Sequence, residues 1–275
     1  METPTAAAAD WLRSVCADPA GALVAFDFDG TLAPIVDDPD SAVAHPDVPG
    51  LLAELATRLG HLAVITGRPA GVAAAKLDLA SVLGHGDVVV LGHYGLERWD
   101  SATGQVQAPP PHAGLARVRR ELPRILESAD AAAAHVEDKT AAVAVHTRRM
   151  TDPAGAIQRL RGPLRTLADE TGLALEPGRM VLELRPPGVD KGGALRAVAR
   201  ETHARSVAFA GDDLGDIAAF DAVDGLRTDG VRGLLVCSGS AEEQTLAARA
   251  DLVVDGPAGI VAWLRALLAD LPTRG

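Results

Sequence analysis

The stretch from Leu23 to Thr31 constrains the fold more than any other part of the sequence. Its apolar first half is too short to span a membrane and is bounded by Gly21 and Gly30, which predicts a buried parallel strand. Asp27 and Asp29 follow at the end of this strand, and residues two apart in an extended chain point to the same side. We therefore expect both carboxylates at the carboxyl end of a central strand, where open α/β sheets bind ligands.

The proximity of these two carboxylates needs compensation, because like charges repel strongly in a low dielectric. Either Asp27 and Asp29 share a proton or a cation lies between them. Hard divalent cations prefer oxygen ligands, so Mg²⁺ is the cation we expect. The alternative interpretation is that both residues only cap the following turn.

Composition narrows the class of protein. A chain of 275 residues with 48% hydrophobic residues can bury one large core together with a smaller inserted or appended domain. Its formal net charge of -11 argues against nucleic acid or an anionic membrane as partner. The two cysteines, Cys16 and Cys237, have no metal-type spacing, which favours a reducing compartment. Without a basic leader or a run of about 18 apolar residues, we expect a cytoplasmic protein. We also expect a monomer that binds a small molecule.

Strands and helices alternate along both ends of the chain, which predicts an α/β fold with a doubly wound parallel sheet. Further apolar runs predict strands over 61–65, 87–91, 206–210, 234–237 and 252–254. Helical spacing of apolar residues predicts helices over 8–18, 50–59, 70–78, 191–203 and 260–271. A further helix is expected after Asp216, and it carries Ile217 and Phe220.

A segment with a different pattern interrupts this alternation. The proline triplet Pro109–Pro111 and the run Pro186-Pro187-Gly188 bracket it, since neither can continue a helix or strand. Within it we expect helices over 112–130 and 153–171 and strands within 133–150, 173–176 and 180–185. The sequence thus predicts a core of residues 1–108 and 187–275, with an inserted α+β domain at 109–186.

The ends of the predicted core strands carry the reactive groups. Phosphoryl transfer needs a metal site, a cation and donors to the phosphoryl oxygens. The sequence contains neither a Gly-x-x-x-x-Gly-Lys-Ser/Thr phosphate loop nor a Gly-x-Ser-x-Gly nucleophile turn, but a carboxylate can itself attack phosphorus. We expect Asp27 to be the nucleophile and Asp29 the acid and base. The other candidates at this edge are Thr66, Gly67, Lys191, Asp212, Asp213 and Asp216.

Thr66 and Gly67 also have a simpler interpretation. A hydroxyl and a glycine after a strand can bind phosphoryl oxygens, or they can form an ordinary strand-to-helix turn with a capping threonine.

The ordered set of motifs resembles the haloacid dehalogenase superfamily of phosphatases. The matching residues are Asp27-Phe28-Asp29-Gly30-Thr31, Thr66, Lys191 and Gly211-Asp212-Asp213-Leu214-Gly215-Asp216. The resemblance implies a Rossmann-like core, Asp27 as nucleophile and Asp29 as acid/base, with catalytic Thr66 and Lys191. It also implies Mg²⁺ held by Asp27, the main-chain carbonyl of Asp29 and Asp212, with Asp213 and Asp216 as ligands or supports.

Within this superfamily the chain resembles the trehalose-6-phosphate phosphatase family. The motifs are Gly92–Glu97, Val136–Lys139, His146–Arg148, Leu182–Pro186 and Asp190–Gly192. The resemblance implies hydrolysis of trehalose 6-phosphate beneath a C2-type cap formed by the insert. It implies that Glu137, Lys139 and Glu183 bind sugar hydroxyls. Further substrate contacts are expected from Gly67, Arg68, His93, Glu97, His146 and Arg148.

Three alternatives stay open. The substrate could be another sugar phosphate, such as sucrose phosphate or a glycosyl-phosphoglycerate. The charged residues of the insert could be an ordinary solvated face. A regulatory subunit without activity is disfavoured because Asp27, Asp29 and Lys191 are all present. The fourth motif also departs from the family pattern Gly-Asp-Asp-x-Thr-Asp-Glu, since Gly215 and Ile217 replace its Thr and Glu.

Overall fold

The computed structural model describes residues 5–36, 38, 41–82, 86–178, 180–239 and 245–272. The chain forms two compact units. The first unit comprises residues 1–108 and 190–275, and the second comprises residues 109–189.

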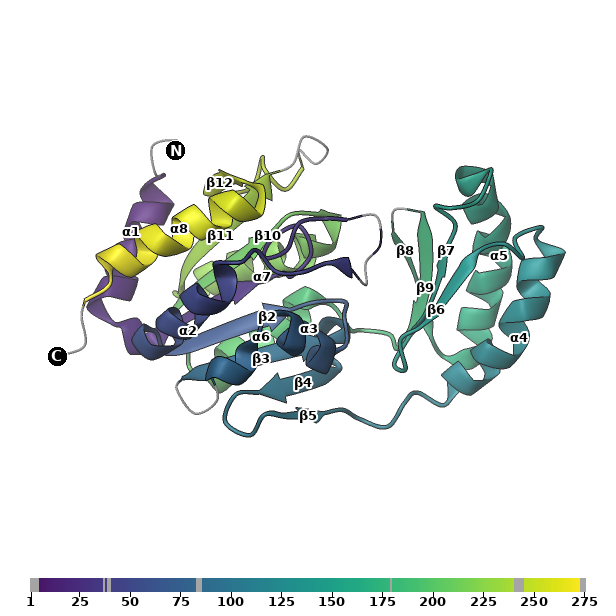
Figure 1. Cartoon of the computed structure of the whole chain (residues 1–275), viewed down its shortest axis with the longest axis horizontal. Helices are drawn as coiled ribbons and strands as arrows, with labels where there is room; N and C mark the ends of the chain where they lie inside the picture. The colour runs from purple at the N-terminus through teal and green to yellow at the C-terminus, as the bar shows by residue number, and fades with distance from the viewer. Residues whose placement is uncertain are drawn as a thin grey trace. The chain divides into compact units, whose positions relative to one another are not determined.

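The first unit is built on an eight-stranded sheet of order β12-β11-β10-β1-β2-β3-β4-β5 (Figure 1). All neighbouring strands from β12 to β3 are parallel, and β4 and β5 extend the sheet in antiparallel fashion. The strands are β1 (Ala22–Phe26), β2 (His61–Ile65), β3 (Asp87–Gly92), β4 (Glu97–Asp100), β5 (Gln105–Gln107), β10 (Ser206–Gly211), β11 (Arg232–Gly239) and β12 (Leu252–Asp255).

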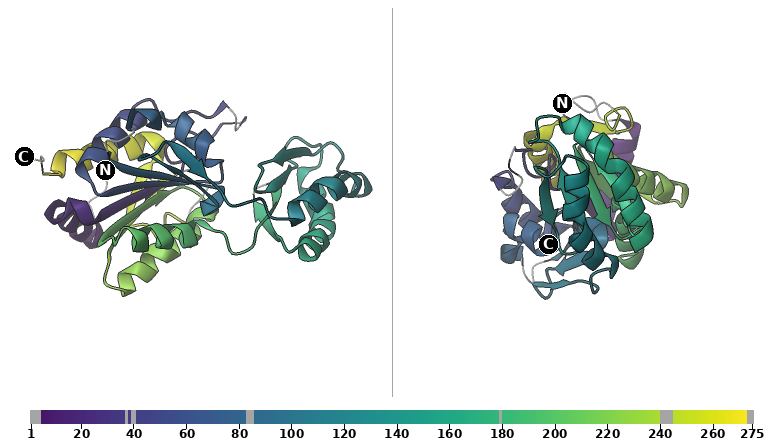
Figure 2. Two further views of the ribbon diagram at one scale, coloured as in Figure 1. Left: turned by 90° about the horizontal axis from the view of Figure 1, so that it is seen from below. Right: turned by 90° about the vertical axis from the view of Figure 1, so that its right-hand side faces the viewer.

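Helices cover both faces of this sheet (Figure 2). Val24 and Phe26 of β1 pack towards α1, α2, α3 and α8, whereas Leu23 and Ala25 pack towards α6 and α7. Both faces of β1 are buried, which explains its continuous apolar sequence. The helices are α1 (Ala6–Ala17), α2 (Val48–Arg58), α3 (Ala70–Lys76), α6 (Lys191–Glu201), α7 (Ile217–Thr228) and α8 (Gly256–Asp270).

The strand order reverses at β1. The chain proceeds from β1 to β2 on one side, and β10 returns to pair with β1 on the other. In an open α/β sheet the carboxyl ends of the strands at such a point flank the ligand crevice. The prediction of a doubly wound, mainly parallel α/β core is confirmed, and the Asp27-Phe28-Asp29 motif follows the strand at the reversal.

The second unit has its own sheet and its own core. Its four strands have the order β6-β7-β9-β8 and are all antiparallel, and α4 (Gly114–Ser128) and α5 (Pro153–Thr171) cover one face (Figure 1). Val143, Val145 and Leu182 point to this covered face, so the opposite face carries the alternate residues. The strands are β6 (His135–Asp138), β7 (Val143–His146), β8 (Ala174–Gly178) and β9 (Val181–Arg185).

The structure adds detail that the sequence pattern did not predict. The alternating stretch at 133–150 is a hairpin of β6 and β7, which turns through Thr140 in the left-handed region at φ 68°. The short antiparallel strands β4 and β5 were not expected, because each is too short to show a clear period. Pro123 lies within α4, and the helix continues through it.

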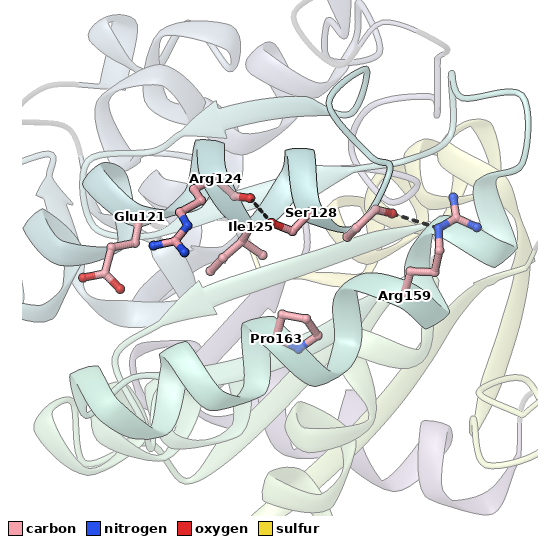
Figure 3. Close-up of a pocket in the computed structure, with 7 residues that line it drawn as sticks. Glu121, Arg124, Ile125, Ser128, Arg159 and Pro163 are labelled. Carbon is pink, nitrogen blue, oxygen red and sulfur yellow. Dashed lines mark hydrogen bonds between the residues drawn. The ribbon is translucent and has the colours of Figure 1, made fainter.

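A pocket of about 660 Å³ lies between the two helices of the second unit (Figure 3). The Arg159 side chain closes one end, where its Nε donates to the carbonyl oxygen of Ala129 at 2.9 Å. The pocket is lined by Glu121, Arg124, Ile125, Ser128, Ala129, Arg159 and Pro163. None of the site residues expected from the sequence lines it.

Within the described part of the chain, no helix is both long enough and apolar enough to cross a bilayer.

The separate core of the second unit gives a testable expectation. Leu160 on α5 is fully buried in it. Leu160→Ala should cost about 2–5 kcal/mol, because the shortened side chain leaves a cavity. Hydrogen exchange should then quicken over residues 109–189 and stay slow in β1 and β10. An equal increase in both units would contradict separate cores, and Gln158→Ala on the exposed side of α5 is the matched control.

Candidate active site

A buried ion cluster lies at the carboxyl ends of β1 and β10. Lys191, the first residue of α6, places its Nζ 2.7 Å from Oδ1 of Asp27 and 2.7 Å from Oδ1 of Asp216. The exposed fractions of Lys191, Asp27 and Asp216 are 4%, 5% and 0%. Buried charges are tolerated when they are paired and hydrogen-bonded. Asp190 fixes the start of α6 by accepting the backbone N–H of Gly193 at 2.6 Å.

Asp216 organises the loop after β10. Its Oδ2 accepts the backbone N–H groups of Asp212 at 3.0 Å and Asp213 at 3.3 Å, while its Oδ1 binds Lys191. Both oxygens are therefore engaged, which suits a support more than a ligand. A Cβ on Gly211 would lie 2.5 Å from the Asp216 carboxyl, so the loop needs glycine there.

Three carboxylates form a candidate cation site. Oxygens of Asp27, Asp212 and Asp216 lie within 4.8 Å of one another. Burial raises the pKa of Asp27 to about 8, although Lys191 lowers it, and burial with the nearby Asp27 raises the pKa of Asp212 to about 9. Burial by itself lowers the pKa of Lys191, but the nearby carboxylates together outweigh it, Asp216 and Asp27 above all, and the pKa is raised well above its usual value. A hard divalent cation fits this all-oxygen donor set, with Asp27 and Asp212 as side-chain ligands.

The side chains of Asp29 and Asp213, the other expected metal residues, have hydrogen-bond partners within the protein. Oδ1 of Asp213 accepts the Gly215 N–H at 2.8 Å and caps the turn Leu214–Asp216. The Asp29 carboxylate binds Arg68, which is compatible with a metal contact through the Asp29 main-chain carbonyl.

The turn after β1 depends on Gly30. Its φ of +78° favours glycine, and a Cβ there would lie 2.0 Å from Oδ2 of Asp212. The hydroxyl of Ser238, near the end of β11, donates to the Gly30 carbonyl at 2.7 Å. Sequence reasoning missed Ser238, although its place near a strand end on the same sheet edge was a usable signal.

Thr66, Gly67 and Arg68 form the loop between β2 and α3. Thr66 is buried, and its Oγ1 accepts the Arg68 backbone N–H at 3.2 Å. The hydroxyl keeps its own proton to donate, so the turn interpretation and the phosphate-binding interpretation are compatible. A Cβ on Gly67 would lie 2.7 Å from the hydroxyl oxygen of Tyr94, so this loop packs closely on the segment after β3.

His93 and Glu97 lie beneath that loop. His93 is 2% exposed, and its Nε2 lies 3.6 Å from Oε1 of Glu97. Oε2 of Glu97 accepts the Ala70 N–H at 2.8 Å, at the first residue of α3. We expected both residues to contact the substrate. In the first unit, their contacts with each other and with Ala70 would also stabilise the loop of Thr66, Gly67 and Arg68.

The second unit holds a separate ion-pair network on the open face of its sheet. Glu137 of β6 and Glu183 of β9 flank Ala144 of β7 in one row across the strands. Lys139 places its Nζ 3.2 Å from Oε1 of Glu183 and 3.8 Å from Oε2 of Glu137. Nε2 of His146 lies 2.8 Å from Oε2 of Glu137. The hydrogen bond with His146 and the charge of Lys139 lower the pKa of Glu137.

This network differs from an ordinary solvated face because two of its members are largely covered. The side chains of Glu183 and Lys139 are only 9% and 14% exposed. Arg148, also expected from the sequence, lies in the exposed turn after β7 and not on a strand.

The fold and the carboxylate–lysine cluster at the strand reversal define a hydrolase core of the haloacid dehalogenase type. The trehalose-phosphatase family model matches residues 25–255, and the chain belongs to this family.

The chain is also similar to individual proteins whose names refer to trehalose-phosphate phosphatases. The chain is 32% identical over 222 residues to a probable trehalose-phosphate phosphatase of Sinorhizobium fredii, covering 79% of each protein. It is 30% identical over 266 residues to a trehalose-phosphate phosphatase of Mycobacterium marinum, covering 92% of this chain but 63% of that protein's length. The crystal structure of a trehalose-6-phosphate phosphatase related protein matches with a TM-score of 0.65 and 26% identity, covering 90% of this chain and 97% of that one.

The raised pKa values predict how cation binding depends on pH. A divalent cation must displace the protons on Asp27 and Asp212, whose pKa values are about 8 and about 9. Affinity for Mg²⁺ should therefore rise from about pH 6 to about pH 9, by up to about tenfold per pH unit for each proton released. Calorimetry in two buffers of different ionisation enthalpy would measure this release. An affinity independent of pH would contradict the site, and Asp212→Asn should weaken both the affinity and its pH dependence.

Proposed function

We propose that this protein is a Mg²⁺-dependent phosphatase that hydrolyses trehalose 6-phosphate to trehalose and phosphate through an aspartyl-phosphate on Asp27. The buried cluster of Lys191 with Asp27, Asp212 and Asp216 supports the chemistry. Membership of the trehalose-phosphatase family supports the substrate.

Asp27 is the nucleophile in this proposal. It follows a fully buried central strand, and its backbone N–H donates to the Ala210 carbonyl at 2.8 Å, which fixes its main chain. Its carboxylate is held by the Lys191 Nζ at 2.7 Å. The Lys191 ammonium neutralises charge on the transferring phosphoryl group, and the Thr66 hydroxyl and Gly67 N–H orient its oxygens. Asp27, Asp212 and the Asp29 carbonyl would hold the Mg²⁺, which would supply further positive charge at these oxygens.

Asp29 handles the protons. As the P–O bond to the sugar breaks, the electron pair passes to the sugar oxygen, which takes the proton of Asp29. The resulting carboxylate then accepts a proton from the water that attacks the aspartyl-phosphate, which restores Asp27 and releases phosphate. The Asp29 side chain is 42% exposed, so it is accessible to both partners.

The second unit selects the sugar. A disaccharide offers many hydroxyl groups, and selectivity needs several placed donors and acceptors. Lys139 supplies donors, and Glu137 and Glu183 supply acceptors, all held by one another on one sheet face. A panel that includes sucrose phosphate and glycosyl-phosphoglycerates, with and without EDTA, separates trehalose 6-phosphate from the rival substrates.

Replacing the nucleophile tests the chemistry. Asp27→Asn should lower kcat by on the order of 10⁴-fold or more, because the amide cannot form the phosphoenzyme. The melting temperature should stay close to that of the wild type, and the exposed Asp229→Asn should keep full activity. Substantial phosphate release by purified Asp27→Asn would exclude the covalent route.

Shortening Glu137, which we propose binds sugar hydroxyls, tests the selectivity for the sugar. Glu137→Ala should raise KM for trehalose 6-phosphate by about 10- to 100-fold, because hydrogen bonds to a charged group are lost. Its KM for p-nitrophenyl phosphate should change little. Glu127→Ala on the exposed side of α4 is the control in the same unit. Equal increases in KM for both substrates would contradict the proposal that this face of the sheet recognises the sugar.

A further inference from the structure

Arg68 binds the Asp29 carboxylate through two hydrogen bonds from its guanidinium group. Its Nε donates to Oδ2 of Asp29 at 2.8 Å, and its Nη2 donates to Oδ1 at 2.6 Å. The guanidinium carbon also lies 5.2 Å from the centre of the buried Phe28 ring. Such a two-point contact fixes the plane of a carboxylate, which a single point charge does not do.

Arg68 is itself held in place by the segment after β3. Its carbonyl accepts the His93 N–H at 3.0 Å, and the Thr66 carbonyl accepts the Tyr94 N–H at 2.9 Å. His93 and Tyr94 both have left-handed backbone conformations, with φ of 47° and 60°. Two such residues in succession are costly, so these contacts stabilise a backbone that would otherwise be unfavourable.

The side chains of Arg68 and Asp29 differ in solvent exposure. The Arg68 side chain is 13% exposed, whereas that of Asp29 is 42% exposed. A half-exposed aspartate without a partner samples several rotamers, which lowers the fraction of time in which it can reach a leaving group. The contact with Arg68 removes this freedom and uses one side of each oxygen, so the other lone pairs stay available.

We propose that Arg68 is a positioning residue for proton transfer, and that it acts by holding the Asp29 carboxyl group instead of binding the phosphate of the substrate. This inference rests on the proposed function, in which Asp29 protonates the departing sugar oxygen as the P–O bond breaks.

Loss of the Arg68–Asp29 contact should affect substrates differently according to whether their leaving group needs a proton. The alkoxide of a sugar must be protonated as it leaves, whereas p-nitrophenolate leaves without a proton. The ratio kcat/KM reports only the steps up to release of the alcohol, so the later attack of water does not affect the comparison. Arg68→Lys keeps the positive charge and loses the two-point contact.

We expect Arg68→Lys to lower kcat/KM for trehalose 6-phosphate by about 10- to 100-fold, which does not exceed the lower end of the roughly 10²- to 10⁴-fold that a proton-transfer group contributes. The value for p-nitrophenyl phosphate should fall by less than about threefold. Combined with Asp29→Asn, Arg68→Lys should cause no further loss on trehalose 6-phosphate, because the two residues act as one unit. Arg98→Lys is the control, since Arg98 binds Glu201 on the surface at 2.8 Å.

Equal losses on both substrates, or losses that multiply in the double variant, would overturn the inference and indicate that Arg68 binds the phosphate. If Arg68→Lys does not fold, Arg68→Gln gives the same comparison. Wild-type protein that hydrolyses p-nitrophenyl phosphate and not trehalose 6-phosphate would reject the proposed substrate. The role of Arg68 would then be tested on glucose 6-phosphate, whose leaving group is also a sugar alkoxide.

Discussion

The contact of one lysine ammonium with two buried aspartates is the interaction on which the arrangement of the candidate active site depends. Lys191 meets Asp27 and Asp216 where α6 begins, and Asp212 adds a third buried carboxylate to the same small volume. One ammonium cannot balance three carboxylates, so the remaining charge is met by protons or by a cation. The raised pKa values of Asp27 and Asp212 express the first solution, and the proposed Mg²⁺ is the second.

Backbone geometry around this cluster leaves little freedom. Gly30 and Gly211 each bring backbone close to a carboxylate where a Cβ would collide, and Ser238 ties the Gly30 turn to β11. The buried Asp216 links the two backbone amides after β10 to Lys191. The reactive groups are thus held by rigid strands and tight turns, as electrostatic preorganisation requires.

Much of this fold was predictable because its elements have clear limits. β2 (His61–Ile65) and α5 (Pro153–Thr171) have the predicted bounds, the first as an apolar run and the second as a proline-started helix with regular apolar spacing. The strands β4 and β5 were not predicted, because their short sequences lack a period. The edge of the sheet that carries Asp27, Thr66, Lys191 and Asp212 followed from the strand ends.

Contacts between distant residues could not be predicted in the same way. The family resemblance implied that Asp216 is a metal ligand or a support, but its binding of Lys191 and two amides depends on how α6 and the loop after β10 meet. Arg68 and Asp29 are separated by 39 residues, and nothing in either motif indicates their contact. His93 and Glu97 are expected to contact the substrate because they lie on a glycine-rich loop. That motif did not indicate that His93 is buried, or that Oε2 of Glu97 accepts the Ala70 N–H.

In the proposed mechanism, Asp27 carries the phosphoryl group for part of each turnover. This intermediate can be trapped by mixing the wild-type protein with Mg²⁺ and trehalose 6-phosphate labelled with ³²P, followed by acid quench within milliseconds and peptide mapping. We expect acid-stable, hydroxylamine-sensitive label on the peptide that contains Asp27. Rapid release of phosphate with no label on the protein at any quench time would contradict it.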